Sequence, residues 1–129
     1  MNKTNKNTPS NVVWFNIPAD DIKRTQKFYS SLFGWQISPF NGMNDTLHID
    51  TGGPDASPDG GITKRQSKDQ AIVNYIGVDS VDKYLKKVQE LGGKVCMPKT
   101  AVPQMGYLAV CQDSENNGFG LWEKDSNAK

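Results

Sequence analysis

Few side chains in this sequence of 129 residues can do acid–base or metal chemistry. His48 is the only histidine, and an imidazole there would suit a general base at neutral pH. The alternative is that this lone strand histidine is only a polar residue lining a surface, and this is the interpretation we favour. Cys96 and Cys111 lack the CxxC spacing of a zinc motif, and two cysteines make no disulfide framework. We expect both to be free, buried thiols.

Aromatic and small polar side chains are suited to binding a ligand rather than to catalysis. Strand alternation predicts that Trp14, Tyr75, Tyr107 and Trp122 lie on sheet faces turned toward a cleft. Asn16, His48 and Thr63 would be polar groups of the same surface. Aromatic residues at such positions are typical of ordinary packing, and they are equally suited to stacking on a flat apolar ligand. Both interpretations stay open.

The elements that must position these residues come in the same order twice. In the first half the sequence predicts strand 12–18, a helix that begins at Asp20 or Asp21 and stops at Gly34, and strands 35–40, 46–50 and 61–64. In the second half it predicts strand 71–77, helix 80–91, and strands 94–98, 106–112 and 118–123. Apolar stripes on the helices and strands predict a core made of Phe15, Ile17, Phe28, Leu32, Ile76, Leu85, Val88, Leu91 and Leu121.

An offset of 59 positions relates the two halves, because it takes Ile17 to Ile76, Leu32 to Leu91 and Gly34 to Gly93. Each half would be a βαβββ module, over residues 11–64 and 71–124, within a single domain spanning 11–124. The expected fold class is α+β, with the paired modules forming a curved eight-stranded mixed sheet and the helices outside. Residues 1–10 and the DSNAK segment after Lys124 are predicted to be free tails.

Composition excludes several classes of partner. Fifteen Lys and Arg residues against fourteen Asp and Glu leave a formal charge of +1, which gives no electrostatic case for nucleic acid or an anionic membrane. No apolar run is long enough to suggest a membrane span, and the N-terminus lacks a signal-peptide core. We therefore expect a cytoplasmic protein.

Several motifs together resemble one superfamily. They are the helix end FYSSLFGW at 28–35, VDSVD at 78–82, LGGKV at 91–95, MGYLAV at 105–110 and FGLWE at 119–123. The combination is similar to the vicinal oxygen chelate superfamily, which includes glyoxalase I, bleomycin-resistance proteins and extradiol dioxygenases. Within it the chain resembles single-chain bacterial proteins related to lactoylglutathione lyase. The likeness covers nearly the whole chain, but one such scaffold hosts many reactions.

The resemblance implies where a metal would bind. Catalytic members hold a divalent ion with His, Gln or Glu on the first and last strands of each half. The matching positions here are Trp14, a residue near Gly61, Val73 and Gly120, none of which offers a side-chain lone pair to a metal. A shift by one residue at Gly61 would give Gly60 or Ile62, neither of them a ligand. We predict no metal and no other cofactor, with Gly61 and Gly120 leaving room for a ligand to approach the backbone.

Three classes of function remain. The first is a metal-free protein that binds a small organic molecule in a cleft lined by Trp14, Asn16, His48, Gly61, Thr63, Tyr75, Tyr107, Gly120 and Trp122. The second is a metal-dependent lyase, isomerase or dioxygenase whose ligands lie elsewhere, so whether the chain is an enzyme stays open. The third is a regulatory partner that uses an apolar sheet edge. The resemblance also implies a homodimer.

Overall fold

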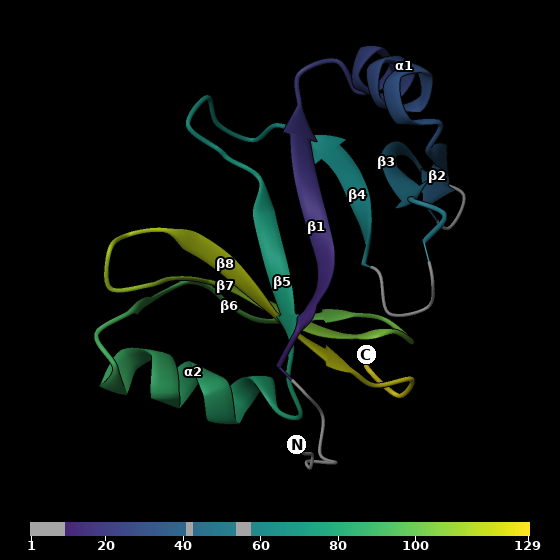
Figure 1. The fold of residues 1–129 in the computed structure, drawn as a ribbon. Coiled ribbons are helices and arrows are strands. Elements are labelled where there is room, and N and C mark those ends of the chain that lie inside the picture. The colour runs from purple at the N-terminus through teal and green to yellow at the C-terminus, as the bar shows by residue number, and fades with distance from the viewer. Residues whose placement is uncertain (1–9, 41–42, 54–57) are drawn as a thin grey trace. The chain divides into compact units, whose positions relative to one another are not determined.

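The computed structural model describes residues 10–40, 43–53 and 58–129 of the chain, which form two modules of βαβββ order (Figure 1). The first contains β1 (Val12–Ala19), α1 (Ile22–Phe33), β2 (Gln36–Phe40), β3 (Met43–Asp50) and β4 (Asp59–Lys64). The second contains β5 (Val73–Gly77), α2 (Val81–Glu90), β6 (Lys94–Val102), β7 (Gly106–Gln112) and β8 (Gly118–Lys124). Eight strands of mixed direction with two helices confirm the predicted α+β class.

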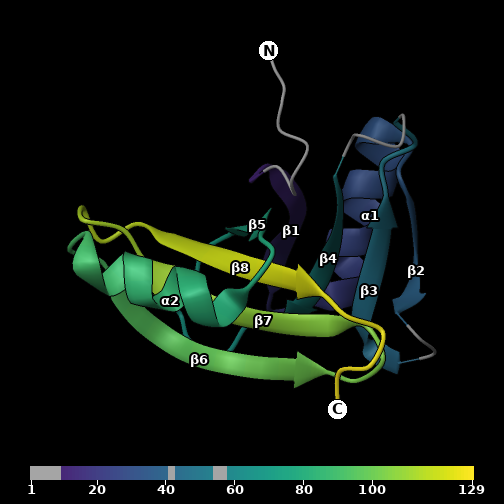
Figure 2. The same ribbon diagram turned by 90° about the horizontal axis from the view of Figure 1, so that it is seen from below.

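In the first module the strands lie in the order β2-β3-β4-β1, with β1 and β4 parallel and the other pairs antiparallel. Helix α1 covers one face of this sheet (Figure 2). Beneath the helix lies a core in which alternate strand residues are buried: Ile17, Ala19, Leu47, Ile49 and Ile62. The intervening residues of the same strands therefore point to the opposite face.

The second module repeats this arrangement in the order β5-β8-β7-β6, with β5 and β8 parallel. Helix α2 covers one face of its sheet (Figure 2). The core on that side consists of Val78, Val81, Ala109, Cys111 and Leu121. The two helices begin at Ile22 and Val81, positions that the sequence offset of 59 superimposes.

Both helices are capped as their sequences predict, with one addition. The Asp21 carboxylate accepts a hydrogen bond from the Arg24 amide at 2.9 Å, and α1 ends at Gly34 with a positive φ of 74°. In α2 the Ser80 hydroxyl accepts from the Lys83 amide at 3.1 Å. The addition is Glu123, whose carboxylate accepts a hydrogen bond from the Val81 amide at 2.9 Å and holds the start of α2.

The predicted core is right at Ile17 and Leu121 in the strands, whereas Ile76 is half-buried and belongs to neither core cluster of the described residues, and the prediction is partly wrong in the helices. Ile17 and Leu121 are buried, but Phe28, Leu32 and Leu91 are 59%, 58% and 80% exposed. Helix α1 instead contacts the sheet through Ile22 and Tyr29, seven positions apart. A helical stripe spans more than 100° of the surface, so residues at its edge can miss a sheet that its centre contacts.

Two boundaries also differ from the prediction. Strand β6 continues past Pro98 to Val102, because register shifts between Val95 and Thr100 accommodate the proline without breaking the ladder. The C-terminal segment is not a free tail: Ala128 is buried, and its carbonyl accepts from the Gln104 amide at 2.8 Å. The predicted N-terminal tail, apart from Ser10, lies outside the described residues. None of the helices in the described ranges has the length and apolar character needed to cross a membrane.

Candidate functional site

Strands β1, β3 and β4 bring five of the predicted site residues onto one face of the first module. Asn16 and His48 both pair with Gly61, so these three positions form a row across the sheet. Trp14 lies two residues before Asn16 on β1, and Thr63 lies two residues after Gly61 on the central strand β4, so both side chains belong to the same face as that row. This surface, which carries Trp14, Asn16, His48, Gly61 and Thr63 on the side opposite α1, is called the Trp14 face below.

An aromatic cluster occupies one end of the Trp14 face. The indole of Trp14 and the imidazole of His48 are stacked, with ring centroids 5.5 Å apart and an interplanar angle of 16°. Phe40 from β2 presents an edge-on contact to each, at 6.0 Å and 6.2 Å. Phe40 was not among the predicted site residues, although it ends the strand that pairs with β3. Together the three rings form a partly apolar aromatic cluster of the kind that aromatic ligands pack against.

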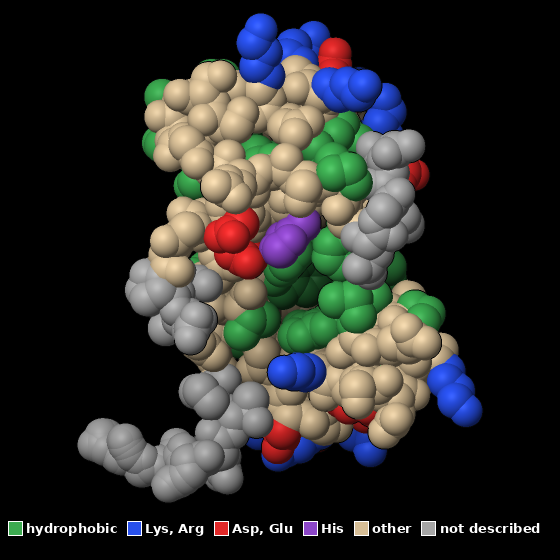
Figure 3. Space-filling model, turned by 90° about the vertical axis from the view of Figure 1, so that its right-hand side faces the viewer, with side chains coloured by type: hydrophobic (Ala, Val, Ile, Leu, Met, Phe, Trp, Pro, Cys, Tyr) green, Lys and Arg blue, Asp and Glu red, His purple; other side chains and the backbone are tan. Residues whose placement is uncertain are grey.

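His48 is anchored by a carboxylate that the sequence analysis also missed. Its Nε2 lies 3.1 Å from Asp59 Oδ2, and both side chains are a little over one-third exposed. Figure 3 shows the single histidine reaching the surface beside acidic side chains. Asp59 precedes Gly61 by two positions on β4, so strand alternation alone could have placed it on the Trp14 face. An imidazole oriented in this way can exchange a proton or a hydrogen bond with a bound molecule.

The polar side chains at the other end of this face pair with each other. The Asn16 amide nitrogen donates to Thr63 Oγ1 at 2.9 Å. This contact uses one N–H of Asn16 and one lone pair of Thr63, so the Thr63 hydroxyl can still donate and the Asn16 carbonyl oxygen can still accept. The face therefore offers one donor and one acceptor next to the aromatic cluster.

Gly61 does not leave the space that the sequence analysis expected. A Cβ atom built at this position would lie 3.0 Å from Trp14 Cζ2 and 3.3 Å from the Leu47 carbonyl oxygen. The indole itself therefore lies over the glycine and fills the gap. The prediction that a ligand approaches the backbone here is wrong, because the missing side chain makes room for Trp14 instead.

In the second module, Tyr75, Gly120 and Trp122 share the sheet face opposite α2. Gly120 pairs with Tyr75 across the parallel β5–β8 ladder, and a Cβ at Gly120 would collide with the Tyr75 ring. The predicted opening at Gly120 is therefore filled as well. Burial raises the pKa of the Tyr75 hydroxyl above its usual value.

Tyr107 belongs to the opposite face of that sheet, so its assignment to the cleft is wrong. It pairs with Glu123, the residue that holds the start of α2, and packs against the core on the helix side. The Lys99 ammonium lies 4.4 Å from the centre of its ring and 2.8 Å from the Asp82 carboxylate. That hydrogen bond to Asp82 raises the pKa of Lys99. The prediction erred by one position because Leu108, not Tyr107, pairs with Trp122.

The residues at the superfamily's metal positions do not fit a metal. Trp14, Val73 and Gly120 have no donor atom for an ion, and the space at Gly61 and Gly120 is taken by aromatic rings. His48, stacked on Trp14, and Asp59, paired with it across the ladder, offer two donors, which is fewer than the three protein ligands that catalytic zinc sites use. Within the part of the chain that the structure describes, no three His, Cys, Asp or Glu side chains come together.

Comparison with known proteins shows which family this chain resembles. Residues 11–51 match the family described as bleomycin resistance protein-like N-terminal. A glyoxylase-like domain-containing protein of Didymella fabae is 34% identical over 111 residues, covering 81% of this chain and 87% of that protein. The anthracycline biosynthesis protein DnrV of Streptomyces peucetius is 27% identical over 133 residues, covering 90% of this chain and 48% of DnrV. The chain thus spans about half the length of that relative.

A solved structure shows the same fold at low sequence identity. It is a superfamily member from Vibrio splendidus, described as glyoxalase/bleomycin resistance protein/dioxygenase. The TM-score is 0.62 at 12% identity, and the match covers 91% of this chain and all of the other.

Proposed function

Because this chain belongs to the glyoxalase/bleomycin resistance/dioxygenase group, the vicinal oxygen chelate superfamily, we propose that its Trp14 face binds a small organic molecule without a metal ion. The observation that carries the proposal is the stacked pair of Trp14 and His48 at 5.5 Å, at the place where catalytic relatives hold a metal ligand. An indole cannot coordinate an ion, but it binds flat rings well.

The chemistry of the Trp14 face defines the class of molecule. A flat conjugated body would stack on the cluster of Trp14, His48 and Phe40. A carbonyl or hydroxyl group on that body would meet the donor and acceptor left by the pair of Asn16 and Thr63. His48, oriented by Asp59, would supply a further hydrogen bond. A small aromatic molecule bearing carbonyl or hydroxyl groups satisfies all three.

Fluorescence and calorimetry test this proposal with a matched control. The chain has three tryptophans, so replacing Trp35 and Trp122 by Phe leaves Trp14 as the sole indole reporter. A panel of aromatic carbonyl and phenolic metabolites is titrated into this variant, into wild type, into Trp14→Ala and into Trp35→Phe. Trp35 stacks on Tyr29 and makes a tilted contact with Phe33 on the helix side, so Trp35→Phe controls for loss of an indole elsewhere.

The expected result is binding that Trp14→Ala weakens by roughly tenfold or more, as loss of a stacking partner implies, while Trp35→Phe leaves it unchanged. Binding that Trp14→Ala leaves intact would place the site elsewhere. Metal analysis of protein purified without chelator checks the other half of the proposal. Stoichiometric metal that survives dialysis and is lost on mutating His48 or Asp59 would refute a metal-free site.

We also propose that the chain forms a homodimer. Support comes from large apolar side chains that remain more than half exposed, including Phe33 on α1 and Leu91 at the end of α2. Light scattering of the purified chain should then give twice the monomer mass of 14.3 kDa. A single species of monomer mass across the micromolar range would contradict it.

A further inference from the structure

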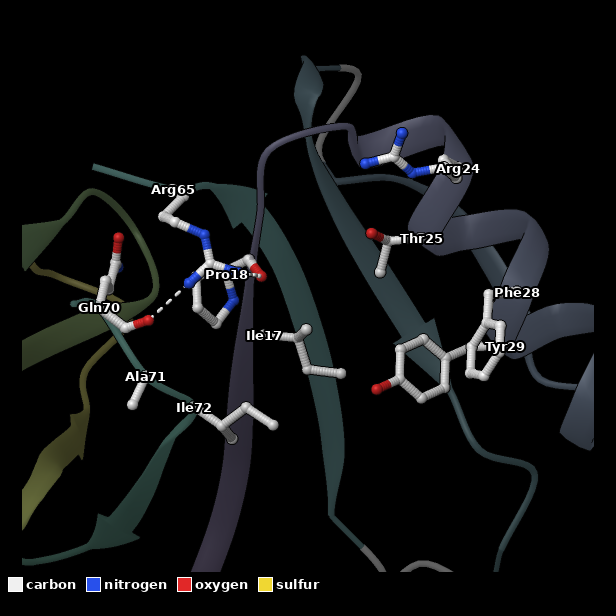
Figure 4. Close-up of a pocket in the computed structure, with 10 residues that line it drawn as sticks. All are labelled: Ile17, Pro18, Arg24, Thr25, Phe28, Tyr29, Arg65, Gln70, Ala71 and Ile72. Atoms are coloured by element: carbon white, nitrogen blue, oxygen red, sulfur yellow. Dashed lines mark hydrogen bonds between the residues drawn. The ribbon is translucent and has the colours of Figure 1, made fainter. Parts of the chain in front are cut away.

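A second hollow of the first module lies on the helix side of the sheet. It has a volume of about 540 Å³ and opens between α1, the end of β1 and the segment 70–72. Figure 4 shows Arg24, Thr25, Phe28 and Tyr29 on the helix side, facing Ile17 and Ile72 across the space. This hollow is called the Arg24 pocket. The Trp14 face takes no part in it, since none of that face's residues line it.

The walls of the Arg24 pocket are apolar and partly fixed. Phe28 and Ile72 are 59% and 54% exposed, which is high for large apolar side chains facing each other across a hollow. Tyr29 is held by stacking on Trp35, with ring centroids 5.5 Å apart and an interplanar angle of 11°. Ile17, buried in the core, forms the floor. An apolar ligand body would cover surface that now faces water.

The charged groups lining the pocket are all cationic. The Arg65 guanidinium donates to the Asp20 carboxylate at 3.2 Å, to the Gln70 carbonyl at 2.7 Å and to the Pro18 carbonyl at 3.3 Å. These three bonds fix its orientation and use three of its five N–H groups. The Arg24 guanidinium lies 3.9 Å from the Asp21 carboxylate, which is beyond hydrogen-bond distance. No Asp or Glu lines the pocket.

The second module shows why the space exists. The offset that takes Ile22 to Val81 takes Thr25 to Tyr84 and Phe28 to Lys87. Tyr84 packs on the core of the second module, and the Lys87 ammonium lies 5.1 Å from the centre of its ring. The first module has a short threonine where the second has this aromatic side chain. The small Thr25 side chain therefore leaves space beside α1 that a tyrosine at this position would reduce.

We propose that the Arg24 pocket binds a small carboxylate with a flat or branched apolar body. The body would lie against Ile17, Phe28 and Ile72, and the carboxylate would lie between the guanidinium groups of Arg24 and Arg65, which suit its geometry. The Thr25 hydroxyl can donate to the same group in place of its present bond to the Asp21 carbonyl. The volume falls within the range of roughly 300–1,000 Å³ that small-molecule sites occupy.

The probe for this site is 2-naphthoate, titrated into the full chain and followed by the shifts of backbone amides in ¹H–¹⁵N spectra. Its matched control is the uncharged 2-naphthamide, which has the same ring system. The variants are Arg24→Gln, Lys23→Gln and Thr25→Tyr. Lys23→Gln removes a charge from the neighbouring position of the same helix, outside the pocket lining. Thr25→Tyr copies the second module and fills the space.

Naphthoate should shift the amides of Thr25, Tyr29, Ala71 and Ile72, and naphthamide should bind more weakly. Arg24→Gln should weaken naphthoate binding by about fivefold, as loss of an exposed ion pair implies, and Lys23→Gln by less than about twofold.

Thr25→Tyr should abolish the shifts, and a melting curve of this variant checks that it still folds. Trp14→Ala should leave them unchanged, which separates this site from the Trp14 face. No saturable shifts at these amides, or equal binding by wild type, Arg24→Gln and Thr25→Tyr, would overturn the proposal.

Discussion

The ring of Tyr75 lies where a side chain at Gly120 would begin. The two residues are partners across the β5–β8 ladder, so the contact is a property of the sheet itself. Gly120 is also a position at which the resemblance to the superfamily implies a metal ligand. A glutamate or histidine there would require Tyr75 to leave its place, so the departure from the superfamily pattern is built into the packing of the second module.

This relationship predicts a stability difference between two glycines of β8. Gly120→Ala should lower the free energy of unfolding by about 1–3 kcal/mol, because the added methyl group overpacks against a partly buried ring. Gly118→Ala is the matched control, since its Cβ would meet only the Cys111 carbonyl oxygen at an ordinary 3.9 Å. Urea denaturation of both variants makes the comparison. Equal stability of the two would show that Tyr75 is free to move.

The core of the first module gives a second prediction. Ile49 is fully buried, so Ile49→Ala should cost about 2–5 kcal/mol of unfolding free energy, as large-to-small core changes do. Leu32 is 58% exposed on α1, and Leu32→Ala should change stability by no more than about 0.5 kcal/mol. Denaturant unfolding measures both. A large loss for Leu32→Ala would mean that an additional contact, such as a second copy of the chain, covers this side of α1.

The two thiols should react at different rates. Cys111 is fully buried as expected, but the expectation is wrong for Cys96, which is exposed. Burial raises the pKa of the Cys111 thiol, with a smaller contribution from Cys96. Under native conditions an aromatic disulfide reagent should modify one cysteine rapidly, and Cys96→Ser should remove that fast phase. Cys111 should react only in denaturant. Rapid modification of the Cys96→Ser variant in buffer would contradict the burial of Cys111.

Asp113 should make stability depend on acid pH. Its carboxylate accepts from the Asn117 amide at 3.0 Å and the Glu115 amide at 2.8 Å, and these bonds lower its pKa below the ordinary value of 3.8. A lowered pKa stabilises the folded state above that ordinary value, and the effect is lost as the pH falls through the lowered one. The stability difference between wild type and Asp113→Asn should therefore shrink between pH 7 and pH 2. A difference that stays constant over this range would exclude the ionised carboxylate as its cause.

Much of the fold could be predicted from the sequence because strands and helices have regular periods. Alternation placed Trp14, Asn16 and His48 on one face of the first module, and the register confirms it. Tyr107 was misplaced because a strand's register cannot be read from its own residues. The filled space at Gly61 was missed for a related reason. Whether the space above a glycine is open depends on the direction of nearby side chains, and here the Trp14 indole lies over Gly61.

The parallel pairing of β1 with β4 has a consequence for synthesis on the ribosome. Trp14 pairs with Asp59, so β1 cannot pair with β4 until the whole intervening chain has been made. At roughly 5–20 residues per second this takes several seconds, whereas the hairpin of β2 and β3 can form as soon as it emerges. During that interval the segment VVWFNI lacks this partner, and it has the β-branched and aromatic composition that promotes aggregation. The nascent chain is therefore most in need of chaperone protection at its first strand.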